Sequence, residues 1–496
     1  MKRSIVDYIA QNAGRAPGRV AIFFKDKKVT YGELEEAAAR CRGALAAQGI
    51  RPGDRVSLVM SDSPEMVIAF LGIMGMGAIA VPCSTLLPPD GLAYVFKDSE
   101  AKLVIVSPEH LENARKASAP RILTMNELLE NASAASLGRF EHDTPCLVLY
   151  TSGSTGQPKG AVHRHGHMPC TVESVARKVY DLKPDDRLFS VPRLFFAYGL
   201  GNSLSIPLGT GASSILVSER PTPALIAEVF VKYRPTVFFA VPTVFRMLLE
   251  HARQGNPLDT SSIKFSVSAG EVLPVATWNE WKALTGGEII ETIGTTELLH
   301  AFIHNYRDRN RPGSSGVVLD GYEVKLEDEG GTVIRGPGRG HLFARGGSAI
   351  PYYLNKPEKT AETIRDGWVR TGDVYRRDEE GFYWFEGRSD DLFKCSGLWV
   401  SPGEVEDAVC RHPAVLEAAV IAEADATGGT IAAAYVLLRP GNAPGDALAA
   451  EIIAKAAENL PRYKRPQRIH FMTELPRTPT GKVQRFKLRA LSSRRA

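Results

Sequence analysis

The stretch LYTSGSTGQPKGAVHRHGHM (149–168) combines glycines, hydroxyl side chains and a lysine in the manner of a phosphate-binding loop. It is not a Walker A loop, because there the lysine lies between a glycine and a serine or threonine, whereas Lys159 follows Pro158 and precedes Gly160. The runs CLVLY (146–150) and GAVHRH (160–165) on either side read as strands, whereas a Walker loop opens a helix. The stretch therefore predicts a phosphate cradle between two strands.

The residue types of this stretch explain how it would bind phosphate. Glycine lets backbone N–H groups approach phosphate oxygens, and consecutive N–H groups form an anion-binding nest. The hydroxyls add donors, and the lysine adds a positive charge for the phosphates. A surface turn rich in glycine and serine is the structural alternative, which the length and order of the stretch argue against. The candidate ligands of the nucleotide are Thr151, Ser152, Gly153, Ser154, Thr155, Gly156 and Lys159.

Outward from the cradle, the first half of the chain alternates helical and strand patterns. YGELEEAAARCRGALAAQGI (31–50) reads as an amphipathic helix, with Thr30 and Glu33 as its capping box. KLVIVS (102–107) reads as a buried strand. MVIAFLGIMGMGAIAV (66–81) reads as a buried helix leading into a strand, because a membrane span needs about 20 apolar residues. This alternation predicts mostly parallel sheets covered by helices.

The second half of the chain has a different pattern of predicted elements. From about residue 311, short strands separated by glycines predict a small β-rich subdomain, and a compact α+β unit follows GRSDD (387–391). We predict an α/β fold with a large N-terminal domain and a smaller C-terminal α+β domain. The predicted bounds are 1–388 for the N-terminal domain, including the subdomain at about 311–388, then 389–391 for the segment that joins the two domains and 392–496 for the C-terminal domain.

Composition limits the class of protein. The 496 residues are 44% hydrophobic and carry a formal net charge of +4, too small to indicate a nucleic-acid partner. The six cysteines have no paired spacing, which fits a reducing compartment and predicts a cytoplasmic protein. The N-terminal residues lack the apolar core of a secretory signal, and no membrane association is expected.

Several further stretches occur together with the cradle, in a fixed order. They are IGTTE (293–297), RTGD (370–373), EGRSDDLFKCSG (386–397) and PRTPTGKVQR (476–485). With YTSGSTGQPKGAVHRH (150–165), this set resembles the adenylate-forming superfamily, which includes acyl- and aryl-CoA synthetases. The resemblance covers nearly the whole chain. It implies that a carboxylic acid attacks the α-phosphate of ATP, and that a thiol then displaces AMP from the acyl-adenylate.

The resemblance assigns a role to particular residues. It implies that Lys482 bridges the acid and the α-phosphate, that Thr296 binds an α-phosphate oxygen, and that Glu297 holds Mg²⁺. It also implies that residues 1–388 bind ATP and the acid. The C-terminal domain would then rotate about Asp390, in a hinge at 389–391, between the two half-reactions. The remaining implied contacts are Thr295 near the phosphates, Gly270 and Glu271 at the adenine, Asp373 and Arg388 at the ribose, and Gly397 beside the pantetheine tunnel.

Three histidines end the cradle, and their alternation predicts that they share one face of a strand. His163, His165 and His167 could thus bind zinc, although no further ligand lies nearby in sequence. The resemblance favours a place in the wall of the acyl-transfer site, with His165 contacting CoA.

The stretch RLFFAYGLGNSL (193–204) suggests the kind of acid, because aromatic residues interleaved with Ala197 and Gly199 would form a flat, narrow slot. Core packing is the alternative. Together with SAGEVLP and TTELLHAF, the stretch at 193–204 resembles the sequences of benzoate-CoA ligases. That resemblance places Ala197, Tyr198, Gly294, His300 and Ala301 around an aromatic ring, and the small Ala301 leaves space for a ring substituent.

The sequence thus predicts an acid–thiol ligase that uses ATP, Mg²⁺ and CoA on a small aromatic carboxylic acid such as benzoate or a substituted benzoate. A monomer or homodimer is expected. The alternatives within the same chemistry are loading of a carrier protein and a heteroaryl, alicyclic or short-chain acid. A nucleotide-binding regulator without catalysis is the alternative from another class, and Lys482, Glu297 and Asp373 argue against it.

Overall fold

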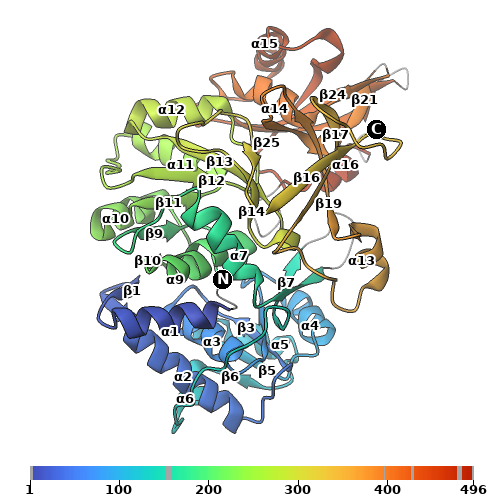
Figure 1. The fold of residues 1–496 in the computed structure, drawn as a ribbon. Helices are drawn as coiled ribbons and strands as arrows, with labels where there is room; N and C mark the ends of the chain where they lie inside the picture. The colour runs from blue at the N-terminus through green and yellow to red at the C-terminus, as the bar shows by residue number, and fades with distance from the viewer. Residues whose placement is uncertain (1–3, 152–157, 396, 426–428, 478–482, 494–496) are drawn as a thin grey trace.

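Two large sheets form the centre of the molecule, and smaller sheets follow them toward the C-terminus (Figure 1). The computed structural model describes residues 4–151, 158–395, 397–425, 429–477 and 483–493. The helix-covered sheets and the α+β C-terminal part confirm the predicted α/β class.

The first sheet has the strand order β6-β5-β3-β4-β7-β8 and is parallel except for the antiparallel pair β7–β8. Its strands are β3 (Arg55–Val59), β4 (Ile79–Pro82), β5 (Leu103–Val106), β6 (Ile122–Leu123), β7 (Pro145–Thr151) and β8 (Lys159–Arg164). The helices of this region are α2 (Tyr31–Ala47), α3 (Pro64–Gly75), α4 (Pro89–Asp98), α5 (Leu111–Lys116) and α6 (Met125–Leu129), with the short η1 (Pro108–His110). The strand before the cradle and the strand after it are therefore confirmed, and they form one hairpin.

Local signals set the helices of this region. The predicted capping box at the start of α2 is present, since the Thr30 side chain accepts a hydrogen bond from the Glu33 amide and the Glu33 carboxylate accepts one from the Thr30 amide. Helix α3 is buried on nearly all sides, as its apolar sequence requires. It packs closely on α2 because Gly72 has no side chain: a Cβ there would lie 2.6 Å from Cys41 Sγ.

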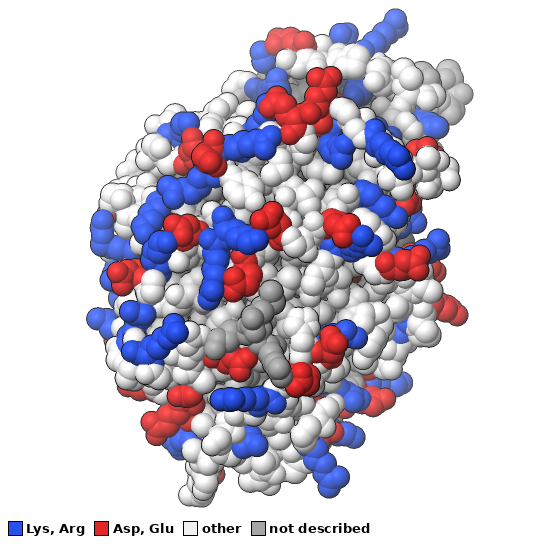
Figure 2. Space-filling model, in the orientation of Figure 1, with Lys and Arg blue, Asp and Glu red and all other residues white. Residues whose placement is uncertain are grey.

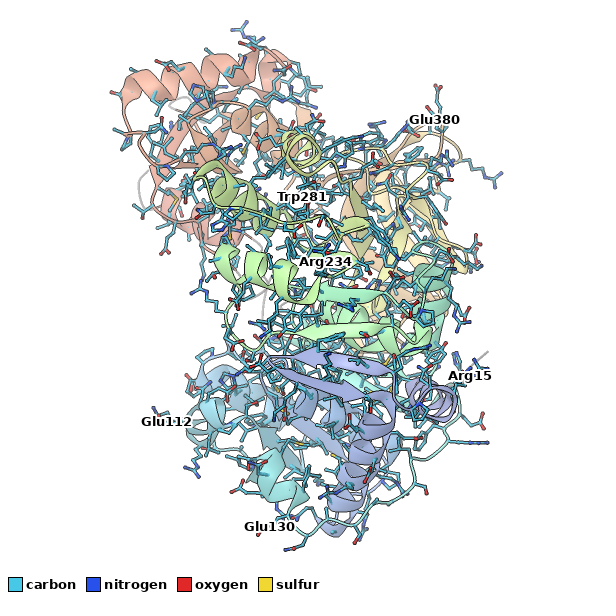
Figure 3. All side chains as sticks on the ribbon, turned by 90° about the vertical axis from the view of Figure 1, so that its left-hand side faces the viewer. Arg15, Glu112, Glu130, Arg234, Trp281 and Glu380 are labelled. Atoms are coloured by element: carbon cyan, nitrogen blue, oxygen red, sulfur yellow. The ribbon has the colours of Figure 1, made fainter. Side chains whose placement is uncertain are left out.

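The second sheet has the order β15-β14-β13-β12-β11-β9-β10-β1-β2 and is parallel from β13 to β1. Its strands are β1 (Val20–Phe24), β2 (Lys27–Thr30), β9 (Arg187–Ser190), β10 (Ser213–Leu216), β11 (Val237–Ala240), β12 (Phe265–Ser268), β13 (Ile289–Gly294), β14 (Ala301–His304) and β15 (Val317–Val318). The helical segments are α1 (Ile5–Arg15), α7 (His167–Thr171), η2 (Val172–Arg177), α8 (Ala197–Leu200), η3 (Gly201–Ser205), α9 (Ile206–Thr210), α10 (Pro223–Tyr233), α11 (Pro242–Arg253), α12 (Val275–Thr285) and the short η4 (Thr296–Leu298). Trp281 of α12, labelled in Figure 3, is buried with its ring edge-on to Phe245 at 5.0 Å.

A five-stranded sheet and the C-terminal elements complete the chain (Figures 1 and 3). The five-stranded sheet contains β16 (Tyr322–Glu327), β17 (Gly338–Gly346), β18 (Ile364–Arg365), β19 (Trp368–Arg377) and β20 (Tyr383–Arg388), with α13 (Pro357–Thr363) beside it. The C-terminal elements are the hairpin β21 (Phe393–Cys395) and β22 (Leu398–Val400), the sheet β23 (Val415–Ala424), β24 (Thr430–Leu438) and β25 (Pro466–Met472), the helices α14 (Pro402–Cys410), α15 (Asp446–Ala457) and α16 (Arg485–Ser492), and η5 (Arg462–Lys464).

Ion pairs join the C-terminal part to α11. Arg246 Nη2 lies 3.3 Å from Glu417 Oε1, and Arg439 Nη1 lies 3.4 Å from Glu250 Oε2. Glu417 also pairs with Arg477, which directly precedes the segment 478–482. These contacts hold the C-terminal part against helix α11.

The surface in Figure 2 intersperses Lys and Arg with Asp and Glu, and the small net charge of +4 agrees with that mixture. Within the part of the chain that the structure describes, every helix is too short or too polar to cross a membrane.

Candidate active site

The hairpin β7–β8 places Lys159 directly opposite Thr151, at the ends of the two strands next to residues 152–157. The Lys159 ammonium lies over the ring of Tyr353, 4.3 Å from its centroid. Burial lowers the pKa of Lys159, and the nearby Glu297 carboxylate opposes that shift. The cradle residues Ser152, Gly153, Ser154, Thr155 and Gly156 lie outside the described residues.

Glu297 is oriented by a tyrosine that the sequence analysis missed. The Tyr353 hydroxyl donates a hydrogen bond to Glu297 Oε1 at 2.5 Å. Burial and the Glu297 carboxylate raise the pKa of Tyr353 well above its usual range, so the hydroxyl remains a donor. The aromatic pair in SAIPYYLN (348–355), between the IGTTE and RTGD motifs, was the available signal.

The turn that carries Glu297 is held by His163. Its Nε2–H donates to the carbonyl oxygen of Thr296 at 2.9 Å, and burial lowers the pKa of His163 to about 3, so the ring is neutral. Thr295, one residue earlier, has a buried Oγ1 without a hydrogen-bond partner among the described residues. An unpaired buried hydroxyl of this kind is suited to a phosphate oxygen.

The three histidines do not share one face, so that prediction is wrong. Strand β8 ends at Arg164, and the turn that follows brings His167 Nδ1 to 3.0 Å from His163 Nδ1. His165 packs elsewhere: its ring stacks on Phe140 at 4.6 Å, and its Nδ1 is hydrogen-bonded to Ser4 Oγ at 2.8 Å. This placement argues against the predicted CoA contact of His165.

The zinc alternative also lacks support. Among residues 4–493 apart from the undescribed gaps, no group of three or more His, Cys, Asp or Glu side chains could hold a metal ion. Burial also lowers the pKa of His165 to about 4 and of His167 to about 2, so all three rings are neutral and serve as hydrogen-bonding groups.

The predicted ribose ligands face each other on neighbouring strands. Asp373 of β19 pairs in register with Arg388 of β20, and Arg388 Nη1 donates to Asp373 Oδ1 at 2.8 Å. Gly372 has a φ of +78°, and a Cβ there would lie 2.6 Å from Arg388 Nη2. The glycine of RTGD therefore permits this ion pair. Arg388 also lies in the electrostatic environment of Glu297 and Lys159, which joins this pair to the phosphate residues.

The residues predicted to line the aromatic slot lie on α8, η3 and the β13–β14 turn. The rings of Tyr198 and His300 lie 5.8 Å apart, and the Tyr198 hydroxyl donates to the Val267 carbonyl at 3.2 Å. His300 Nε2 donates to Asn202 Oδ1 at 3.1 Å, and burial lowers the pKa of His300 to about 3. The slot is therefore uncharged on this side. Ala197 begins α8, and Ala301 is buried at the start of β14.

Glycines allow these slot elements to approach one another. A Cβ on Gly201 would lie 2.2 Å from His300 Cδ2, and a Cβ on Gly294 would lie 2.4 Å from the His300 carbonyl oxygen. Gly294 pairs with Ala301 across the turn. The backbone at Gly201 thus lies directly against the His300 ring, and that at Gly294 lies against the His300 backbone.

The remaining predicted residues lie in loops and turns. Gly270 follows β12 with a φ of +93°, and Glu271 lies in the electrostatic environment of Arg485 on α16. Gly397 has a φ of +79° between β21 and β22, and Asp390 lies in the turn after β20. Lys482 lies outside the described residues.

Comparison with known proteins agrees with this geometry. The family model of AMP-binding enzymes matches residues 9–354, and that of their C-terminal domain matches residues 404–482. The chain belongs to the AMP-binding enzyme family.

Among the members of the AMP-binding enzyme family similar to this chain is the benzoate–CoA ligase of Thauera aromatica, 38% identical over 98% of this chain and 95% of that one. An anthranilate CoA ligase solved in complex with anthranoyl-AMP superposes with a TM-score of 0.95 at 36% identity, covering 99% of this chain and 97% of that one. A benzoate CoA ligase from Burkholderia xenovorans LB400 gives a TM-score of 0.91 at 37% identity, covering 98% and 99%.

Replacing Tyr353 with phenylalanine tests its role beside Glu297 in this AMP-binding enzyme. Groups that orient a metal-binding carboxylate typically contribute ~10- to 100-fold in metal affinity or activity. Since the resemblance assigns Mg²⁺ to Glu297, we expect the Mg²⁺ concentration for half-maximal adenylation to rise by about tenfold or more. Pyrophosphate exchange at varied Mg²⁺ measures this shift. The exposed neighbour Tyr352 provides the control, since Tyr352→Phe should leave the Mg²⁺ dependence unchanged; equal curves for both variants would contradict the role.

Proposed function

We propose that this chain is an ATP-dependent aryl-CoA ligase. It adenylates a small aromatic carboxylic acid with release of pyrophosphate, and it then transfers the acyl group to CoA with release of AMP. The observation that supports this most directly is the meeting of the phosphate residues Lys159 and Glu297, through Tyr353, with the Asp373–Arg388 pair. An uncharged slot at Tyr198 and His300 accompanies them.

In the first half-reaction, a carboxylate oxygen of the acid attacks the α-phosphorus of ATP, and the bond to pyrophosphate breaks. Lys159 at the mouth of the cradle supplies positive charge to the departing phosphates, and Thr295 and Thr296 supply fixed donors at the α-phosphate. Asp373 accepts hydrogen bonds from the ribose hydroxyls while Arg388 holds its carboxylate in place. These groups stabilise charge without reorganising during the reaction.

Mg²⁺ fits the residues present. This ion usually binds through one or two carboxylates together with substrate phosphates and keeps several waters. Glu297 offers one such carboxylate, oriented by Tyr353. When bound, Mg²⁺ would neutralise phosphate charge beside Lys159.

In the second half-reaction, the thiol of CoA attacks the acyl carbon, and the bond to AMP breaks. We assign residues 1–388 to the domain that holds the adenylate and residues 392–496 to a domain that turns about Asp390 to admit CoA, with Gly397 reaching the pantetheine. His163 remains a neutral support of the Thr296 turn throughout.

The slot favours an aromatic acid with a small polar substituent. His300 Nε2 is the donor to Asn202, so Nδ1 of this neutral ring is an acceptor, and it has no partner among the described residues. A ring hydroxyl or amino group that reaches Nδ1 would satisfy it. The small side chain of Ala301 leaves room for such a group.

A substrate panel tests the proposal. Pyrophosphate exchange is measured with benzoate, hydroxy- and aminobenzoates, a heteroaryl acid, cyclohexanecarboxylate and hexanoate, and thioester formation is then followed with CoA. We expect exchange and thioester with aromatic acids and neither with hexanoate. Exchange without a CoA thioester would favour loading of a carrier protein instead, and silence with every acid would refute the proposal.

A further inference from the structure

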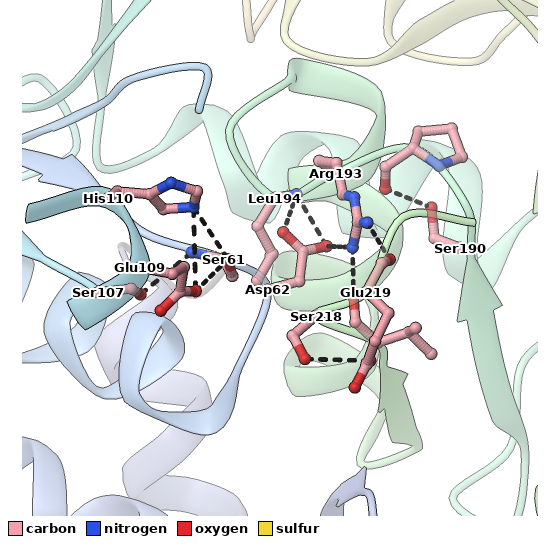
Figure 4. A network of polar contacts seen from close by, with 12 residues as sticks. Ser61, Asp62, Ser107, Glu109, His110, Ser190, Arg193, Leu194, Ser218 and Glu219 are labelled. Carbon is pink, nitrogen blue, oxygen red and sulfur yellow. Dashed lines mark hydrogen bonds and ion pairs between the residues drawn. The ribbon is translucent and has the colours of Figure 1, made fainter. Parts of the chain in front are cut away.

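A buried carboxylate lies at the junction of the two large sheets, outside the set of residues used above. Asp62 follows β3 of the first sheet, and its side chain is only 4% exposed. Figure 4 shows the carboxylate directed away from its own sheet toward the segment that leaves β9 of the second sheet. Its oxygens Oδ1 and Oδ2 accept a bifurcated hydrogen bond from the Leu194 amide at 3.1 and 3.3 Å.

Arg193, the residue before Leu194, completes the contact. Its Nη1 lies 4.0 Å from Asp62 Oδ2. The same guanidinium donates to the carbonyl oxygens of Val217 and Glu219, which follow β10 (Figure 4). Asp62 and Arg193 therefore connect three chain segments, which follow β3 of the first sheet and β9 and β10 of the second sheet. A buried carboxylate requires such partners, because burial without them is costly.

The segment held in this way leads directly into the aromatic slot. The Phe196 amide donates to the Arg193 carbonyl at 3.0 Å, and the Leu200 amide donates to the Phe196 carbonyl at 2.8 Å. The chain folds back so tightly that a Cβ on Gly199 would lie 2.0 Å from the Arg193 carbonyl oxygen. A displacement of Leu194 or Arg193 is therefore transmitted to Ala197 and Tyr198.

Resting on the proposed aryl-CoA ligase function, we propose that Asp62 is a positioning residue of the aromatic slot. Its carboxylate fixes the Arg193–Leu194 turn and, through that turn, the position of Tyr198. The carboxylate binds an amide and a guanidinium, neither of which is part of the ATP site. Its influence is therefore directed to the acid rather than to the nucleotide.

The test compares Michaelis constants in the pyrophosphate-exchange reaction. Hydrogen bonds to a charged group contribute about 1.5–3 kcal/mol, which corresponds to a factor of ten or more. We expect Asp62→Ala to raise KM for the preferred aromatic acid about tenfold or more, while KM for ATP changes less than about twofold. Asp62→Asn keeps an acceptor for the Leu194 amide and loses the charge facing Arg193, so it should give an intermediate KM for the acid. This variant can still be measured if Asp62→Ala does not fold.

Asp186 provides a matched control at the other end of β9. It is also buried, and it accepts hydrogen bonds from the Lys183 amide at 2.8 Å and the Thr236 hydroxyl at 2.7 Å, with Lys264 at 2.6 Å. We expect Asp186→Asn to lower thermal stability without changing KM for the acid. Equal KM values in the Asp62 and Asp186 variants, or a parallel rise of KM for acid and ATP, would overturn the positioning role. Wild-type protein inactive with every aromatic acid would instead refute the proposed function.

Discussion

Replacing Lys482 with alanine is expected to slow adenylate formation by at least ~100-fold, because a positive group that stabilises developing charge typically contributes ~10²–10³ in rate. Thioester formation from supplied acyl-adenylate should largely survive, since the α-phosphate is then already bonded to the acid. The two half-reactions are measured separately, by pyrophosphate exchange and by release of AMP from the acyl-adenylate with CoA.

The residues on either side of the segment 478–482 are held by the C-terminal part. Arg477 and Val483 form an isolated β-bridge, and the Gln484 amide donates to the Pro476 carbonyl at 2.8 Å. On the C-terminal side of this bridge, Arg485 Nη2 contacts both oxygens of Glu406 at 2.6 and 2.9 Å. The two ends of the segment are thus fixed to the C-terminal part and would move with it.

Lys487 provides the control for the lysine substitution. It is exposed on α16, so Lys487→Ala removes a nearby positive charge without removing the proposed transition-state contact. We expect both half-reactions of this variant to remain within about twofold of wild type, as for most surface substitutions. An equal loss in both half-reactions of Lys482→Ala would contradict its assigned role.

Replacing Asp390 with proline is expected to reduce CoA thioester formation about 100-fold while adenylation changes much less. Proline locks φ near −65° and restricts the preceding residue, so a turn about this position would be blocked. Asp390 lies just before Asp391, whose Oδ1 accepts from Arg489 Nη1 at 2.9 Å and whose Oδ2 lies 3.5 Å from Arg485. The arginines of α16 thus hold the chain beside the proposed hinge.

Asp390→Ala separates the backbone effect from the loss of the carboxylate. Alanine keeps φ and ψ free, so this variant should retain most of its thioester formation. Single-turnover rates of both half-reactions decide the outcome. If the proline variant makes thioester at the wild-type rate, domain rotation about residue 390 is excluded; if alanine and proline are equally impaired, the carboxylate rather than the backbone is required.

The features that the sequence predicts correctly depend on neighbours along the chain. The capping box of Thr30 and Glu33 needs only three residues of spacing, and the apolar run at 66–81 spans most of the buried helix α3 and of the strand β4. The α/β class follows from the same local patterns repeated along the chain. Where a local pattern ended earlier than expected, the prediction was wrong: β8 stops at Arg164, so His165 turned away from His163 and His167.

The sequence by itself therefore determined the class of fold and the order of the nucleotide motifs, because periodicity and motif spacing are local properties. Only the tertiary structure decided which side chains orient these motifs. Tyr353 reaches Glu297 across 56 residues, and Asp62 reaches Leu194 across 132 residues. Such pairs depend on how two sheets pack and on the need to satisfy each buried polar group, and neither condition is written in the spacing of nearby residues.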